Sequence, residues 1–321
     1  RSKCTAAQLL DPSPMGARTN ARWKVTRKSN APDHVTTAKG ITKSGYLHNF
    51  NSLGIQMEYE YKACSLTPMK YFQKDAGSKH PFTKCGDDNT FHVIFVGDSV
   101  MRVQKDRFDE MVQHLPNIKT SYVSLHGGFR RVEMLEETFP IKLADIERRA
   151  AQDTKILLFN TGLHDIHRLC GNEWKEDRYT YLDREILDSG KFSCTKEYRA
   201  VIHDFALVME NFHADLKIFQ TTTAAWPKYG NYGLEWPLGG QVMPVTPDFV
   251  PIFNEIALDV MTKQHRDSFQ IMDGYWITYS RPDNREIGTV GSKLSHPGLE
   301  VQSAMSRIFA MLFLEKICSS S

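Results

Sequence analysis

Apolar residues follow two different spacings from Phe91 to the end of the chain. Short, continuous apolar runs are typical of buried strands, and they occupy residues 92–97, 119–128, 155–162, 215–224 and 269–273. Apolar residues at helical spacing follow these runs and predict helices over residues 103–115, 143–154, 197–214, 248–265 and 298–318. This repeated alternation of strand and helix is typical of a parallel sheet with helices on both faces.

The first part of the chain lacks this alternation. Its first 45 residues contain few large apolar side chains, and residues 46–90 contain aromatic clusters and turns. We therefore expect an irregular N-terminal appendage over residues 1–90 that packs on an α/β domain formed by residues 91–321. In such a domain, ligands bind at the carboxyl ends of the strands.

Composition and charge exclude several classes of protein. Apolar residues make up 41% of the chain and charged residues 24%, as in ordinary globular proteins. The net charge of +2 gives no general attraction to nucleic acid or membranes, so we expect no nucleic-acid partner. The Lys- and Arg-rich first 44 residues form either a solvated basic arm or a contact with an anionic surface. The chain begins at Arg1, which leaves room for an upstream signal peptide or membrane anchor.

The six cysteines are widely spaced, and none belongs to a Cys-x-x-Cys pair. An even number suits three disulfides in a lumenal or extracellular protein, and the alternative is a cytosolic protein with free thiols. Sequence alone does not select the pairing. Our prediction joins Cys4 to Cys318, Cys64 to Cys85, and Cys170 to Cys194.

Polar segments follow the predicted strands, among them "GDSVMR", "HGGFR" and "NTGLHD". They are either ordinary loops or the walls of a site. Ser99 opens the first helix, where its own N–H group and the helix dipole favour a negative charge. His296 precedes the last helix in "SHPG", and we expect it in a loop above the strand ends.

Ser99 and His296 together suggest acyl-transfer chemistry. A serine hydroxyl is a weak nucleophile until a base takes its proton, and the resulting oxyanion needs hydrogen-bond donors. We predict that Ser99 Oγ and a ring nitrogen of His296 lie within hydrogen-bond reach or one water apart. Backbone N–H groups of Gly127 or Gly128 and the side-chain amide of Asn160 are the predicted oxyanion donors.

The segment "FVGDSVMRVQ" resembles the first sequence block of the PC-esterase branch of the SGNH hydrolases, which includes the trichome-birefringence-like polysaccharide O-acetyltransferases. The matching positions are Gly97, Asp98, Ser99, Arg102 and Gln104. "LLFNTGLHD" resembles the family's second block, and "MEYEYKACSLTPMKYF" resembles its lead-in. The closing "IMDGYWITYSRPDN" and "SHPGLEVQSAMSRIFAMLFLEKIC" resemble the neurexophilin-and-PC-esterase group. The likeness runs from Tyr59 to Cys318.

This resemblance implies an SGNH-like catalytic domain over residues 91–321, with a flavodoxin-like three-layer fold around a parallel five-stranded sheet. It implies a serine-dependent carbohydrate O-acetyltransferase or acetylesterase in the lumen of the secretory pathway (Golgi) or outside the cell. No bound cofactor is expected; acetyl-CoA or an acetylated carbohydrate would donate the acetyl group to a glycan or to water. The alternative is a non-catalytic glycan-binding or structural extracellular module that kept the fold.

One departure from the family pattern concerns the acid that orients the catalytic histidine. The family has an aspartate three positions before that histidine, and here the position holds Lys293. Three alternatives are open at this point. Asp273 or Asp283 orients the histidine instead, a Ser–His dyad is enough for catalysis, or the site is weakened or inactive. We favour Asp273 as the orienting acid. Because an ammonium beside the imidazole would disfavour its charged form, we expect Lys293 to point into solvent.

Other polar residues near the strand ends have two interpretations each. Asp98 is either an acid catalyst or a structural acid that bonds loop amides, and we favour the structural role. Arg102 either pairs with Asp98 or meets an anionic or sugar ligand. His164 is expected to line the substrate cleft, whereas its "HDIH" segment is too weak a pattern to predict a metal. The aromatic run over residues 226–236 either covers the core or stacks on a sugar.

Overall fold

The structure is a computed structural model. It describes residues 2–10, 20–28, 55–86, 88–125, 128–129, 139–170, 193–225, 246–281, 285–288 and 291–318.

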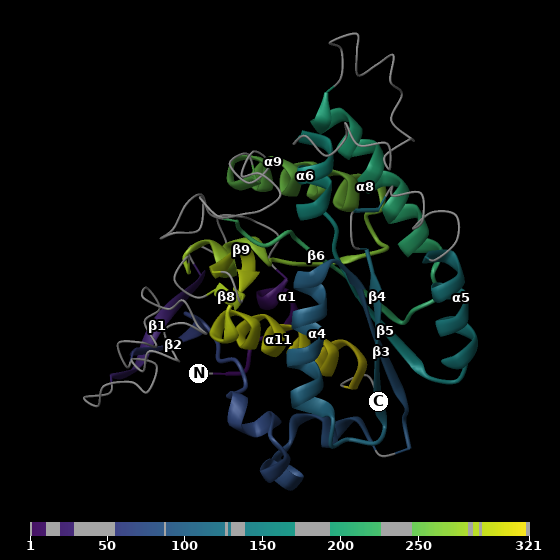
Figure 1. The fold of residues 1–321 in the computed structure, drawn as a ribbon. Coiled ribbons are helices and arrows are strands. Elements are labelled where there is room, and N and C mark those ends of the chain that lie inside the picture. Colours follow the sequence, from purple (N-terminus) through teal and green to yellow (C-terminus); the bar gives the residue numbers. More distant parts are fainter. Residues whose placement is uncertain are drawn as a thin grey trace.

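Within these residues, five parallel strands form a central sheet (Figure 1). They are β3 (Phe91–Gly97), β4 (Ile118–Ser124), β5 (Thr154–Phe159), β6 (Leu216–Gln220) and β7 (Gln270–Met272). Their spatial order is β4-β3-β5-β6-β7, which is the flavodoxin-like order with its switch point between β3 and its two neighbours. The predicted α/β class and parallel five-stranded sheet are confirmed.

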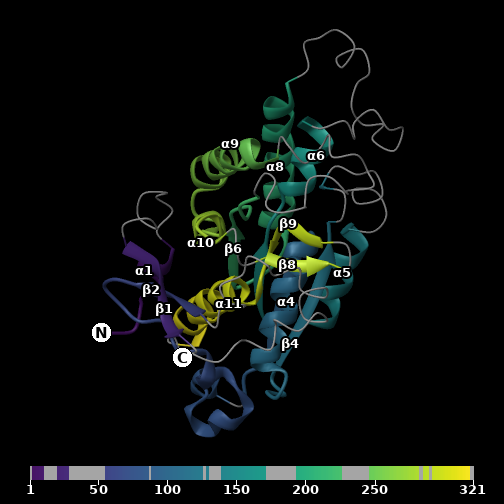
Figure 2. The same cartoon turned by 60° about the vertical axis from the view of Figure 1, so that its left-hand side comes forward.

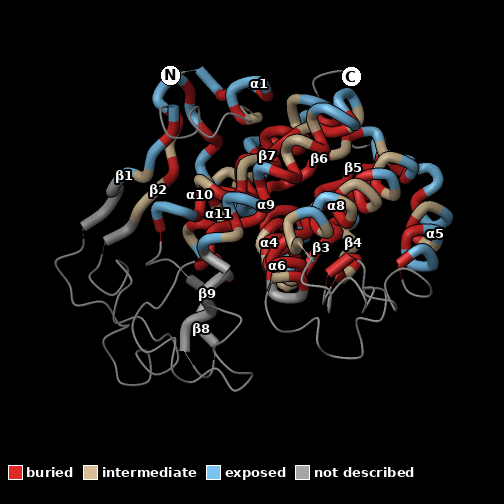
Figure 3. The backbone as a smooth tube through the Cα atoms, turned by 90° about the horizontal axis from the view of Figure 1, so that it is seen from above, coloured by how far each residue is buried: buried red, intermediate tan, exposed pale blue. Residues whose placement is uncertain are grey.

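Helices cover both faces of the sheet, so that the domain has three layers (Figures 1 and 2). One face packs against α4 (Ser99–Val112) and α11 (Leu299–Phe313). The other packs against α5 (Phe139–Arg149), α6 (Leu163–Cys170), α8 (Cys194–Asn211) and α9 (Thr246–Asp259). Seen from above in Figure 3, buried residues concentrate in the sheet and on the sides of the helices that face it. A short helix, α10 (Tyr275–Tyr279), follows β7.

The N-terminal segment has more regular structure than we predicted. It contains α1 (Ala6–Leu9) and an antiparallel hairpin of β1 (Ala21–Lys28) and β2 (Ile55–Tyr61), followed by 3₁₀ turns at Met69–Phe72, Lys74–Lys79 and Pro81–Cys85. Its apolar side chains share one core cluster with β3, α4 and α11. On α11, the buried Arg307 forms an ion pair with Glu58 at 2.7 Å and donates to the Thr67 carbonyl at 2.7 Å. The segment is therefore anchored to the α/β domain through the interior.

Three disulfides join the six cysteines, and two of our predicted pairs are wrong. Cys4 bonds to Cys64, and Cys85 bonds to Cys318, whereas the predicted Cys170–Cys194 pair is confirmed. The reason is that Lys3 forms a β-bridge with Ser65, beside Cys64, while the turn at Pro81–Cys85 packs against the π-helical turn Leu314–Cys318 that follows α11. Three disulfides fit a protein of an oxidising compartment. Among the described residues, no helix is long and apolar enough to cross a membrane.

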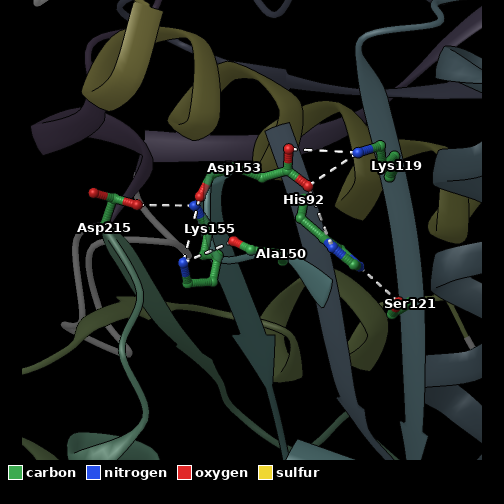
Figure 4. Close-up of polar contacts among 7 residues, drawn as sticks. All are labelled: His92, Lys119, Ser121, Ala150, Asp153, Lys155 and Asp215. Atoms are coloured by element: carbon green, nitrogen blue, oxygen red, sulfur yellow. Dashed lines mark hydrogen bonds and ion pairs between the residues drawn. The ribbon is translucent and has the colours of Figure 1, made fainter. Parts of the chain in front are cut away.

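A buried polar cluster occupies the amino-terminal end of the sheet (Figure 4). His92 Nε2 lies 2.7 Å from Ser121 Oγ, while His92 Nδ1 lies 3.9 Å from Asp153, which Lys119 contacts at 3.2 Å. Burial lowers the pKa of His92, and nearby positive charges add to this effect while Asp153 opposes it. Ser121 lies within a strand and lacks the N–H groups of a helix start. We assign this serine–histidine contact a structural role.

Candidate functional site

The turn from β3 into α4 presents Ser99 at the carboxyl end of the sheet. Asp98 is the N-cap of α4, and its Oδ1 accepts a hydrogen bond from Val100 N–H at 2.9 Å. Ser99 is the first residue of the helix, so its N–H group has no acceptor within the helix. A Cβ on Gly97 would lie 2.8 Å from Met101 Cβ and 3.1 Å from the Asn160 carbonyl oxygen, so only glycine allows this close turn. Asp98 thus bonds a backbone amide as predicted, but this amide belongs to the first turn of α4 and not to a loop.

Tyr122 on β4 fixes the same turn from the neighbouring strand. Its hydroxyl lies 3.0 Å from the carbonyl oxygen of Gly97 and 2.7 Å from that of Asp98. Burial raises the pKa of Tyr122, so its hydroxyl stays protonated and able to donate. The two carbonyl groups beside Ser99 are therefore held in one orientation.

His296 reaches Ser99 from an antiparallel ribbon. The ribbon consists of β8 (Arg285–Gly288) and β9 (Gly291–Pro297), and β9 packs against α4. His296 Nε2 lies 2.7 Å from Ser99 Oγ, although the two residues are 197 positions apart. The predicted contact is confirmed, but His296 belongs to a strand and not to the loop that we expected. Pro297 is followed by α11, where Gln302 Nε2 donates to the Pro297 carbonyl at 2.6 Å.

The donor and acceptor in this contact depend on the tautomer of His296, and one tautomer allows proton transfer from Ser99. Ser99 is half-buried and His296 is 7% exposed, so little water competes for the bond. When the imidazole is neutral with its proton on Nδ1, Nε2 accepts from the Ser99 hydroxyl. The arrangement can then remove the serine proton as Ser99 Oγ attacks a carbonyl carbon.

The two predicted oxyanion donors have other hydrogen-bond partners in the structure. Asn160 is buried after β5, and its Nδ2 donates to the Gln220 carbonyl at 2.8 Å and to Thr222 Oγ1 at 3.3 Å. The Gly128 N–H group donates to the Leu125 carbonyl at 2.9 Å. Service as oxyanion donors would require both groups to exchange these partners.

Asp273 follows β7 and precedes Gly274, the N-cap residue of α10. Its Oδ1 accepts from Trp276 N–H at 3.1 Å and from Thr221 Oγ1 at 3.2 Å. Three strand spacings, about 14 Å, separate β7 from β3. Asp273 therefore has a structural role at the turn after β7, and its role toward His296 remains a prediction.

The loop after β6 is a scaffold for this edge of the sheet. The side chain of Asn254 on α9 both accepts from Thr222 N–H at 2.7 Å and donates to the Thr222 carbonyl at 2.9 Å. The Thr221 hydroxyl accepts from Gly274 N–H at 2.9 Å. These bonds satisfy buried backbone groups, which indicates a structural role for this strand end.

Arg102 and His164 lie on helices at the same edge. Arg102 is exposed on the first turn of α4, and no ion pair joins it to Asp98 in the described part of the chain. His164 is half-buried on α6, so "HDIH" forms part of a helix where we expected a loop. Its neighbour Asp165 is fully buried and accepts from the Thr161 hydroxyl.

Among the described residues, no group of three or more ligating side chains could hold a metal ion.

Several predicted residues lie outside the described residues: Gly127, Asp283 and the aromatic run over residues 226–236, together with the side chains of His167 and Lys293.

Sequence reasoning missed Tyr122 and Gln302, both of which hold the segments that carry Ser99 and His296. Only the position of Tyr122 near the end of a predicted strand pointed toward it. No known protein-family model matches the chain, and a search of curated proteins finds no significant match.

Proposed function

We propose that the chain is an SGNH-type O-acyltransferase or esterase that acts on O-acetyl groups of carbohydrate. The observation that carries the proposal is the 2.7 Å contact between Ser99 Oγ and His296 Nε2 at the carboxyl end of a parallel sheet. The family resemblance of the Ser99 and His296 segments supplies the substrate class. It also supplies the location, the Golgi lumen or the outside of the cell, with which the three disulfides agree.

The proposed reaction has two half-reactions. Ser99 Oγ attacks the acetyl carbonyl carbon while His296 Nε2 takes the hydroxyl proton. The C–O or C–S bond to the donor then breaks, His296 returns the proton to the leaving group, and an acetyl ester forms on Ser99. A sugar hydroxyl or water attacks this ester, with His296 again taking and returning the proton.

The oxyanion of each half-reaction would form beside the start of α4. Ser99 N–H and the helix dipole favour negative charge there. Asn160 and Gly128 are the further proposed donors, after release from Gln220 and Leu125. Asp273 is the proposed acid for the imidazolium, and Arg102 and His164 are the proposed substrate contacts.

The test supplies acetyl-CoA or an acetylated oligosaccharide as donor and follows acetate release and acetyl transfer to a second oligosaccharide. Turnover that is lost in Ser99→Ala and His296→Ala is the expected result. A folded parent protein without turnover on any acetyl ester would support the alternative of a non-catalytic module.

A further inference from the structure

The two ends of the ribbon that carries His296 are joined by a buried ion pair. Arg281 stands four residues before β8, and Glu300 stands three residues after β9. Arg281 Nη2 lies 2.5 Å from Glu300 Oε2. Because Arg285 pairs with Pro297 at the end of the ribbon, the ion pair closes the ribbon at the end nearest His296.

The N-terminal hairpin covers this ion pair. The ring of Trp23 on β1 lies 4.5 Å from Arg281 Cζ, and Trp23 Nε1 donates to the Ile277 carbonyl of α10 at 3.1 Å. On β2, Met57 N–H donates to Glu300 Oε1 at 3.1 Å. Figure 2 shows the hairpin beside α11, which β2 contacts. The hairpin therefore supplies a cation–π contact and a hydrogen bond to the two charged partners.

Burial gives this ion pair a single arrangement. Arg281 is 1% exposed, and the Glu300 side chain is 13% exposed. A buried charge that loses its partner is strongly unfavourable, because water cannot replace the partner. Arg281 and Glu300 thus stay together, and the chain between them has both its ends fixed. A general base needs such fixed geometry, since a displacement of about 1 Å can lower a rate by about 10²-fold.

We propose that Arg281 and Glu300, covered by Trp23 and Met57, are positioning residues for His296. They hold the ribbon so that the imidazole reaches Ser99, which makes the N-terminal hairpin a working part of the site. As a statement about catalysis, this inference rests on the proposed function.

The experiment compares two variants that each remove the negative charge of one ion pair, the first at the ribbon and the second between the hairpin and α11. Glu300→Gln keeps an oxygen that can accept from Met57 N–H but removes the charge paired with Arg281. The matched control is Glu58→Gln, which removes the partner of Arg307 in the middle of α11, away from the ribbon. Thermal unfolding establishes that each variant is folded.

The first readout is the rate of Ser99 labelling by a fluorophosphonate, measured across a range of pH values. In the parent we expect this rate to rise with pH, because only a neutral imidazole can accept the serine proton. We expect Glu300→Gln to lower the rate by about ten- to a hundredfold and to flatten the rise, approaching the profile of His296→Ala. Glu58→Gln should keep the parent's profile.

The second readout does not depend on activity. The ring proton signals of His296 in NMR spectra report its contact with Ser99, and Ser99→Ala defines the signal without the contact. We expect Glu300→Gln, but not Glu58→Gln, to move the signals toward those of Ser99→Ala. If the parent protein is never labelled at Ser99, the proposed function is wrong, but the NMR signals still test whether Arg281 and Glu300 position His296.

A folded Glu300→Gln variant with the parent's labelling profile and His296 signals would overturn the inference. Should Glu300→Gln fail to fold, Arg281→Lys replaces it, with Arg307→Lys as its control. Lysine keeps the positive charge but lacks the planar fork that meets Glu300 and stacks on Trp23, so the same loss of rate and the same signal shift are expected.

Discussion

The hydroxyl of Tyr122 lies 2.7 Å from the carbonyl oxygen of Asp98, so strand β4 holds the turn that presents Ser99. Tyr122→Phe removes this bond and leaves the ring in place. We expect a loss of about 1 kcal/mol in the free energy of unfolding and slower labelling of Ser99 by a fluorophosphonate. The control is Tyr71→Phe, whose ring lies near Lys70 in a 3₁₀ turn of the N-terminal segment. Equal labelling of both variants and the parent would show that the bond does not position Ser99.

Asp273 has a structural role and a predicted catalytic role, which one substitution separates. Asp273→Asn keeps an oxygen that can accept from Trp276 N–H in the first turn of α10, but it removes the charge that would stabilise the imidazolium of His296. We expect acetyl-ester turnover to fall by about tenfold or more. If Asp273→Asn keeps its turnover while Asp283→Asn loses it, Asp283 is the orienting acid. If neither matters, Ser99 and His296 work as a dyad.

Gly162 joins β5 to α6 at the same edge of the sheet. Its φ is +157°, and a Cβ there would lie 2.1 Å from Thr222 Oγ1. Gly162→Ala should lower the free energy of unfolding by at least about 2 kcal/mol, measured by chemical denaturation. Gly77→Ala is the matched control, because Gly77 has φ +52° with no atom within 4 Å of a Cβ. A loss in Gly162→Ala no larger than that in Gly77→Ala would contradict the steric explanation.

His92 makes stability depend on pH. Its pKa in the folded state is lowered, mainly by burial, below the unfolded value of 6.5. Between these two values the unfolded chain binds more protons, so the free energy of unfolding should fall as pH falls below about 6.5. His92→Gln should reduce this dependence, measured by denaturation at several pH values. His213→Gln, at an exposed position, should retain it; the same slope in both variants would exclude His92 as the cause.

The central sheet could be predicted because each strand is buried on both faces. A continuous apolar run such as that of β3 is best interpreted as a buried strand when a segment with helical spacing follows it. The hairpin was missed although β1 and β2 both alternate apolar and polar residues, because 27 positions separate the two strands and the segment lacks the strand–helix repetition that revealed the sheet. The pairing of Cys4 with Cys64 likewise depends on contacts between distant segments, which composition and spacing do not encode.

The site was predicted in part. Ser99 and His296 were recognisable because serine and histidine can act together in nucleophilic catalysis. One stands at a strand-to-helix turn and the other just before the last helix. The ribbon that holds His296, the Tyr122 bonds and the Arg281–Glu300 pair were not, because each joins elements remote in sequence. Asn160 has the residue type of an oxyanion donor, yet its actual partners Gln220 and Thr222 follow from the packing of β6 beside β5.

The most direct test of the central claim is covalent labelling by a fluorophosphonate, read by intact mass and peptide mapping. We predict one adduct, located on Ser99, that is absent in Ser99→Ala and forms at least about 10²-fold more slowly in His296→Ala. A folded parent protein without an adduct on Ser99, or an adduct that forms equally fast in His296→Ala, would contradict the claim that His296 activates Ser99.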